Sequence, residues 1–261
     1  MIPLIAQRTI ALFHDVRTVF LRSITQVLRN PVWVVVTLVQ PLFYLLFYAP
    51  LLTRTIGSNR LNGGSAYDIF VPGLLMQLAL FGTAFAGFGL VSELREGVIE
   101  RMLVTPVRRS ALLIGRVLAN LVALVFQATV ITLVSWPMGL NLRPSAILGV
   151  LVLLGVGITF ASLSYTVSMI LGNEDALAGL LNFVTVPILL LSGMLLPLSL
   201  GPKWLQRVAN INPLKHAVDA ARDLFRGNLT TFAVGRGVTV VFVCAAAALI
   251  IGTRKFEHYA D

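Results

Sequence analysis

Long apolar segments without charged side chains constrain this chain more than any other feature of its sequence. A helix needs about 20 apolar residues to cross the hydrocarbon core of a bilayer. Five such segments are plain, and a sixth becomes long enough when it is extended back to Phe232. They cover residues 31–52, 69–92, 117–142, 144–172, 176–202 and 232–253. Because 57% of all residues are apolar and only 12% are charged, we predict an all-α membrane protein, residues 1–261, with six transmembrane helices in one domain.

The first segment, residues 1–30, has a different pattern. From Phe13 to Leu28, apolar residues recur every three or four positions, while polar residues such as Arg22 fall on the other face of a helix. This periodicity predicts an amphipathic helix that lies in the membrane interface. Charges such as Arg8 and Asp15 interrupt the apolar core that a cleaved signal peptide needs, so we expect this segment to remain in the mature chain.

A second segment outside the apolar runs covers residues 203–228, and its pattern divides at the sequence Asn-Ile-Asn-Pro. Asn212 is suited to cap a helix that has Pro213 at its first position, and Gly227 is suited to end it. We therefore predict two short helices here, with the later one in or dipping into a membrane interface.

Charge places the chain among membrane proteins rather than nucleic-acid binders. The net charge is +9, but the basic residues flank the apolar runs, where anionic lipid headgroups can meet them. Six spans put both termini on one side. Lysine and arginine counts favour a cytoplasmic location for the termini by a small margin, because the basic segment 203–236 opposes the rule.

Known energy sources and catalytic motifs are missing from the sequence. It contains no phosphate-binding loop of the form Gly-x-x-x-x-Gly-Lys-Ser/Thr, no His-Glu-x-x-His and no Gly-x-Ser-x-Gly. The five clear spans also carry no ionisable residue, which disfavours a carrier driven by an ion gradient. We therefore expect no enzyme activity, no metal site and no cofactor on this chain, and we expect an energised partner.

Neutral polar and aromatic side chains inside the spans are candidates for a substrate path. Hydrogen bonds between helices explain single polar residues more often than a path does, and lipid contact or packing explains single aromatic residues more often. The candidates are Gln40, Phe43, Phe47, Gln77, Phe81, Phe85 and Asn182.

A densely charged segment, residues 93–116, separates two of the apolar runs. Glu93, Glu96 and Glu100 are spaced three and four apart and would share one face of a helix that Pro106 ends or kinks. From the spacing alone, two interpretations stay open: a solvated helix at the membrane surface, or an acidic stripe that docks on a cationic partner.

The residues of this segment resemble the signature of ABC-2 type permeases, written loosely as E-x-R-E-x-x-x-E-R-x-x-x-T-P. The match continues within the segment to Arg109, Leu113, Gly115 and Arg116, and a second match begins at Ser192 and Gly193. It includes Trp204, Leu205, Asn212, Pro213, Leu214 and Arg222. Among these permeases, the chain is most similar to the daunorubicin-resistance and nodulation types.

The resemblance implies cytoplasmic termini in the cell membrane and a coupling helix, residues 93–105, which docks on a separately encoded ATP-binding subunit that holds ATP and Mg. The implied coupling residues are Glu93, Arg95, Glu96, Glu100, Arg101, Thr105 and Pro106. The turn at Glu174 and Asp175 is either a second contact with the ATPase or a plain turn. Residues 203–228 become external re-entrant helices, with Trp204, Asn212, Pro213 and Arg222 as their characteristic residues.

The resulting hypothesis is the permease subunit of an ATP-driven exporter for an amphipathic or hydrophobic drug, lipid or glycolipid. Two copies, or this chain with a close homologue, would enclose the path, and the sequence leaves homodimer and heterodimer equally open. The alternative is a membrane scaffold that recruits a soluble partner through its charged loop without transport.

Overall fold

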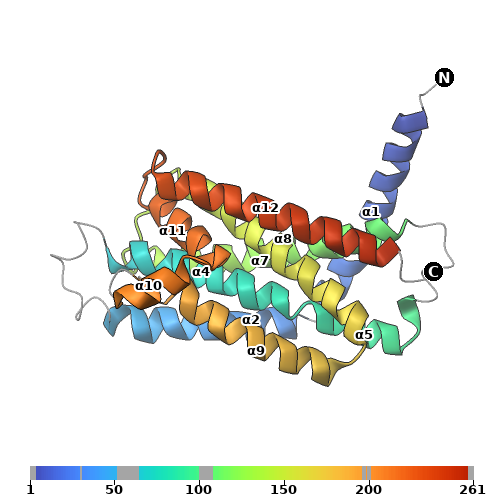
Figure 1. Cartoon of the computed structure of the whole chain (residues 1–261), viewed down its shortest axis with the longest axis horizontal. Coiled ribbons are helices and arrows are strands. Elements are labelled where there is room, and N and C mark those ends of the chain that lie inside the picture. Colours follow the sequence, from blue (N-terminus) through green and yellow to red (C-terminus); the bar gives the residue numbers. More distant parts are fainter. Residues whose placement is uncertain are drawn as a thin grey trace.

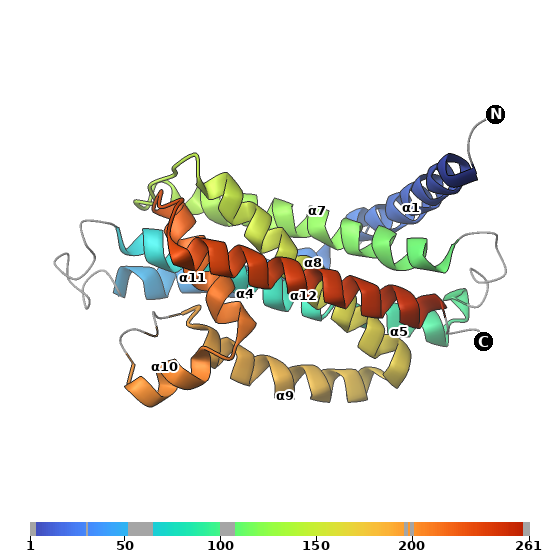
Figure 2. The same ribbon diagram turned by 45° about the horizontal axis from the view of Figure 1, so that its top comes forward.

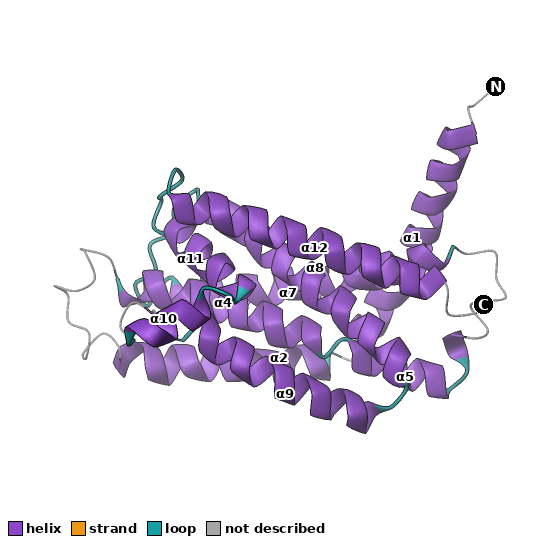
Figure 3. Ribbon diagram, viewed as in Figure 1, coloured by secondary structure: helices purple, strands orange, loops and turns teal. Residues whose placement is uncertain are grey.

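The computed structural model describes residues 4–29, 31–51, 65–99, 108–195, 198 and 201–257. Among these residues there are helices, turns and loops but no strand (Figure 3). Within the same part of the chain, six helical segments are long and apolar enough to span a membrane: Val34–Leu51, Ala66–Arg95, Arg109–Ser135, Ala146–Leu171, Glu174–Ser192 and Phe232–Glu257. The predicted all-α architecture with six membrane spans is confirmed.

The elements follow one another as helices joined mostly by short connections. In chain order they are α1 (Leu4–Arg29), α2 (Val32–Phe43), η1 (Tyr44–Tyr48), α4 (Ala66–Ala84), α5 (Gly87–Arg95), α7 (Arg109–Ser135), α8 (Ala146–Leu171), α9 (Glu174–Ser192), α10 (Lys203–Ala209), α11 (Pro213–Phe225) and α12 (Phe232–Glu257). The first span is α2 continued by the π-helical turn η1, which follows Pro41, a residue without a backbone N–H. The second span is α4 continued by α5.

Helix bounds differ most from the apolar runs at two spans. The third helix starts at Arg109 and ends at Ser135, whereas the apolar run covers 117–142. The fifth ends at Ser192, well before residue 202, because Gly193 adopts a left-handed conformation with φ 72°. An apolar run shows only which residues are stable in lipid. The helix itself begins and ends at its capping residues, and it continues through polar residues that find hydrogen-bond partners.

The helices form one elongated bundle with two distinct ends (Figures 1 and 2). One, here called the α5 end, contains the C-terminal ends of α5, α8 and α12 and the start of α9. The opposite one, here called the α11 end, contains α10 and α11 together with the start of α4. Helix α1 leaves the bundle at a steep angle near the α5 end, so the first and last helices of the chain meet at the same end.

Helix α1 contacts the bundle through Asp15, which accepts from the Arg108 backbone N–H at 3.2 Å, and through residues of its second half. Val19 is buried, and a Cβ on Gly115 of α7 would lie 2.8 Å from the Val19 side chain, so the absence of one allows close packing. Phe13 and Leu28 remain about three quarters exposed. An amphipathic helix whose apolar face the protein covers only in part is suited to the membrane interface, as the sequence predicts.

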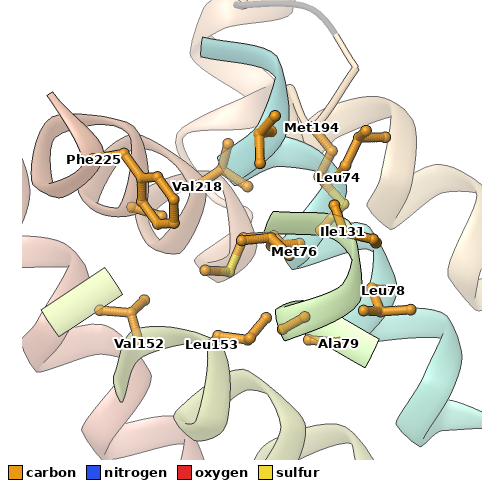
Figure 4. Packing of buried hydrophobic residues seen from close by; sticks show 14 of the residues in the cluster. Leu74, Met76, Leu78, Ala79, Ile131, Val152, Leu153, Met194, Val218 and Phe225 are labelled. Carbon is orange, nitrogen blue, oxygen red and sulfur yellow. The ribbon is translucent and has the colours of Figure 1, made fainter. Parts of the chain in front are cut away.

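Helix α4 forms the centre of the core. Every residue from Ala66 to Leu80 is buried except Ile69. Its apolar side chains meet those of α7, α8 and α11, including Ile131, Leu153 and Val218 (Figure 4). A helix that is enclosed on all sides cannot move without repacking its neighbours, so α4 is the fixed axis of the fold.

Candidate functional site

The α5 end contains an ion pair that the sequence does not reveal. Glu93 of α5 pairs with Arg116 of α7, and Gln26 of α1 donates from Nε2 to Glu93 Oε1 at 3.1 Å. The two charged side chains are only 14% and 8% exposed. Glu93 therefore points into the protein, where it connects α1, α5 and α7. Its predicted role in coupling remains a prediction and would act through these helices rather than by direct contact.

The predicted continuous helix over residues 93–105 is wrong in its first part. Helix α5 ends at Arg95, with Glu96 as its C-cap, and Gly97 takes a left-handed φ of 67°. Glycine reaches this conformation without the steric cost of a Cβ, so Gly97 ends the helix and turns the chain. Glu93 and Glu96 thus do not begin one long acidic stripe. The other coupling residues, Glu100, Arg101, Thr105 and Pro106, lie outside the described residues.

Exposed charges from two distant parts of the sequence meet at the α5 end. Arg95 Nη1 lies 3.9 Å from Glu174 Oε1, and Arg95 Nη2 lies 3.5 Å from Asn173 Oδ1. Glu174 and Asp175 occupy the first turn of α9 rather than a free turn, with Asn173 as the N-cap that accepts from the Asp175 N–H at 2.9 Å. Solvent-exposed pairs of this kind contribute little to stability, so these charges can be exchanged for contacts with a partner.

Span two is interrupted where α4 ends and α5 begins, and a side chain from α8 bridges the break. The Ser164 hydroxyl donates to Ala84 O and accepts from the Gly87 N–H, the latter at 3.0 Å. A Cβ at Gly87 would lie 2.6 Å from Ser164 Oγ. The bridge satisfies backbone groups that the break would otherwise leave unpaired. Ser164 is not among the residues predicted from the sequence, where its only signal is the presence of small residues, glycine and serine, on both helices.

At the α11 end, the predicted pair of short helices is present. Asn212 caps α11 by accepting from the Leu214 N–H at 3.0 Å, Pro213 is its first residue, and Gly227 has a φ of 88° just after its end. Asn212 also donates to Ile188 O at 2.9 Å, which joins α11 to α9. Trp204 of α10 is mostly exposed. Helix α11 packs against α4, α8 and α12 and belongs to the bundle core.

Arg222 is the central residue of the α11 end. Its Nε donates to Ile69 O at 3.0 Å, and its Nη2 donates to Gly193 O at 2.7 Å and to Met194 O at 3.2 Å. Burial lowers the pKa of Arg222 to about 10, so the guanidinium stays charged at neutral pH. A cation suits the C-terminal carbonyls of α9, which carry the negative end of the helix dipole.

The seven candidates for a substrate path do not meet within one chain. Gln40, Phe43 and Phe47 face outward from the first span, and Asn182 is exposed on α9, where it donates to Ala178 O. Gln77 is buried in the core, and its amide has no hydrogen-bond partner within the described residues. Two pairs form groups: the stacked rings of Phe81 and Phe85, with centroids 6.2 Å apart, and the tilted rings of Phe43 and Phe47, with centroids 5.8 Å apart. A common path through all seven residues stays a prediction for an assembly of two chains.

A sequence profile of ABC-2 type transporters matches residues 14–225, a range that includes both ends of the bundle. The chain belongs to the ABC-2 type transporter family. ABC-2 proteins are membrane components of ABC transporters, so this multi-pass membrane protein is a transport permease of the ABC class.

Three relatives of this ABC-2 permease resemble it over most of their length. The transport permease ycf38 of Pyropia yezoensis is 29% identical over 82% of this chain and 75% of its own length. The daunorubicin resistance ABC transporter permease protein DrrB1 of Streptomyces coeruleorubidus is 24% identical over 84% of this chain and 76% of its own. The doxorubicin resistance ABC transporter permease protein DrrC of Mycobacterium tuberculosis is 26% identical, with 90% and 86% covered.

Proposed function

We propose that this chain is the membrane-spanning subunit of an ATP-driven exporter in the cell membrane, with both termini in the cytoplasm. A partner subunit binds ATP and Mg and supplies the energy, since this sequence has no phosphate-binding loop. The proposal is carried by two facts taken together: the chain belongs to the ABC-2 family, and exposed charges gather at the α5 end. In this orientation the α5 end faces the cytoplasm, and α10 and α11 lie on the outer side.

The ATPase docks on exposed charges of the α5 end. Glu96 and Asp175 are exposed, and Arg95 and Glu174 form only a solvent-accessible pair. Behind this surface, the buried pair of Glu93 and Arg116 connects α5 to α7 and, through Gln26, to α1. Movement imposed on the α5 end by the closing ATPase is thereby passed to three elements at once. Spans one and five, together with the α5 part of span two, then tilt and open a route outward.

A second permease copy, or a close homologue, covers the least buried spans. The apolar windows in Val34–Leu51 and Glu174–Ser192 are each 17% buried, against 67% in Ala66–Arg95. Such exposed faces are most commonly buried between subunits of oligomers with closed symmetry. The outward-facing Gln40, Phe43, Phe47 and Asn182 would then line a path between two chains. An amphipathic or hydrophobic cargo fits these walls, and the names of DrrB1 and DrrC support a drug as one such cargo.

Charge reversal tests the docking surface. Glu96→Lys combined with Asp175→Lys should abolish co-purification of the ATPase and reduce ATP-driven uptake of daunorubicin into inverted vesicles by about ten-fold or more, because like charges then meet at the contact. Lys203→Glu, a reversal at the exposed start of α10, is the matched control and should change neither. Unchanged association in the double variant, at an unchanged level in the membrane, would contradict the docking surface. Association without ATP-dependent transport in the unmodified protein would favour the scaffold hypothesis.

A further inference from the structure

A cavity of about 670 Å³ lies at the α5 end, between α1, α5, α7 and α8. This volume is in the range of pockets that hold drug-sized ligands. One wall is apolar and is formed by Val27, Phe85, Phe88 and Leu90. The rings of Phe85 and Phe88 are nearly parallel, with an interplanar angle of 16° and centroids 5.8 Å apart. This wall presents aromatic surface suited to contact with a planar apolar group.

Other residues of the lining carry hydrogen-bond donors. Arg116 is 93% buried, since only 7% of its surface is exposed, and its Nε has no partner within the described part of the chain. Tyr165 accepts a hydrogen bond from Asn120 Nδ2, so the hydroxyl retains its own proton for donation. Both residues line the cavity. A buried donor without a partner costs about 1–3 kcal/mol. Because Nε is closed even to water, a ligand oxygen would relieve this cost only after the guanidinium turns toward the cavity.

The charges of the cavity select against ionic groups. Three charged residues line the cavity. Glu93 offsets the charge of Arg116, and the partly exposed Glu174 pairs with Arg95. Both carboxylate oxygens of Glu93 already accept hydrogen bonds, from Gln26 and from Arg116. An anion near Arg116 would approach the Glu93 carboxylate, and a cation would approach the guanidinium. A neutral oxygen acceptor meets neither repulsion and can accept from the free donors.

We propose that this cavity binds neutral aromatic amphipaths that carry a carbonyl or hydroxyl oxygen, with the oxygen toward Arg116 and Tyr165 and the rings against Phe85 and Phe88. The assignment as a cargo site rests on the proposed exporter function. In that orientation the cavity lies on the cytoplasmic side and holds cargo before outward movement. Binding itself requires neither ATP nor the ATPase.

Photo-crosslinking of benzophenone, a neutral aromatic ketone, tests the site with the purified full chain in lipid nanodiscs. We expect saturable labelling of peptides that contain Val27, Phe88 or Leu90. Fluorenone should compete for this labelling about three- to ten-fold better than fluorene, which has the same rings but no carbonyl oxygen. Labelling that does not saturate, or equal competition by the two compounds, would overturn the proposal.

Variants separate the donors from the shape of the cavity. Tyr165→Phe removes one hydroxyl, and Arg116→Lys keeps a charge for Glu93 but removes Nε, so each should cancel most of the advantage of fluorenone. Tyr67→Phe, another buried tyrosine but at the α11 end, is the matched control and should leave it unchanged. If Arg116→Lys fails to fold, Tyr165→Phe alone decides: an undiminished advantage of fluorenone in that variant would overturn the proposed donor wall.

Filling the cavity gives an independent test. A Cβ at Gly89, which lines the cavity, would meet no atom within 4 Å, so Gly89→Leu should reduce benzophenone labelling about ten-fold without disturbing the fold. Gly179→Leu, at an equally open position on α9, is its control. Undiminished labelling in Gly89→Leu would contradict the site. If the chain is labelled saturably but shows no ATP-driven transport, the exporter function is refuted and the binding site stands. If the chain transports cargo but these peptides are not labelled, the binding site is refuted and the exporter function stands.

Discussion

The two ends of the bundle are held together by different kinds of contact. At the α11 end, one buried arginine donates to three main-chain carbonyls on two segments, and α11 is enclosed by α4, α8 and α12. At the α5 end, contacts between side chains predominate, the second span is interrupted at residues 85–86, and a cavity remains between the helices. The α11 end is therefore built as a fixed cap, whereas the α5 end can rearrange at a lower cost in packing.

This difference suits a protein that receives force at one end. Side-chain pairs can break and re-form without changing the helices that carry them, whereas main-chain carbonyls capped by Arg222 can be released only if α9 and α11 separate. We therefore expect substitutions at the α11 end to affect stability most, and substitutions at the α5 end to affect both stability and coupling to ATP hydrolysis.

The largest effect is expected from Arg222→Met, which leaves the carbonyls of Ile69, Gly193 and Met194 without their donor. Loss of hydrogen bonds from a charged group and burial of unpaired carbonyls should lower the free energy of unfolding by about 4 kcal/mol. The midpoint of thermal unfolding of the purified protein in detergent measures this loss. Arg222→Lys should recover less than half of it, because an ammonium cannot reach several carbonyls in a fork. Lys203→Met, at an exposed position on α10, should leave the midpoint unchanged; an equal effect there would remove the contrast between buried and exposed cations.

Glu93→Gln is expected to have the next largest effect, because it leaves Arg116 as a buried charge without its partner. Removing one member of a buried ion pair typically costs about 3 kcal/mol. Arg116→Gln should cost a similar amount, and the double variant should cost less than the sum of the two, since no charge then remains unpaired. Thermal unfolding gives the energies, and ATP hydrolysis stimulated by cargo in the assembled complex gives the coupling. Wild-type coupling in the double variant would show that the pair is structural only.

The smallest of the three effects is expected from Gly73→Ala, which tests close packing at the α11 end. An added Cβ would lie 2.0 Å from Met194 O, a main-chain atom in the loop that Arg222 holds. Such overpacking should lower the free energy of unfolding by about 2 kcal/mol. Gly179→Ala, at an open position within α9, should instead raise it slightly, because alanine favours a helix. Unchanged stability in Gly73→Ala would show that the α11 end yields as readily as the α5 end.

Local patterns predicted those features that depend on neighbours in the sequence. Apolar runs of about bilayer thickness identified the spans, and helical periodicity identified α1. Asn212 and Pro213 identified the start of α11, because a cap and a first-turn proline act within a few residues. The same reasoning failed at Gly97, where a pattern of acidic spacing suggested a helix that a single left-handed residue interrupts.

The partners of the polar residues were beyond the reach of these patterns. The sequence alone places Glu93 in an exposed acidic stripe, but in the fold α7 brings Arg116 beside it. The sequence alone suggests a surface charge at Arg222, but in the fold the end of α9 presents its carbonyls to this residue. Asp68 marks the boundary of a span in the sequence, yet it accepts from the Asn141 backbone N–H at 2.9 Å and so joins the first turn of α4 to the loop that follows α7. Each contact joins residues that are distant in the sequence.

By itself, the sequence determined that this is a membrane protein and how many times it can cross, and it predicted that the energy comes from a partner, because apolar length and missing motifs are local properties. Tertiary structure alone decided which charges are buried in pairs, which stay exposed for a partner, and where a cavity with a free donor opens. Those outcomes depend on which helix faces are brought together, and packing of the whole bundle sets that arrangement.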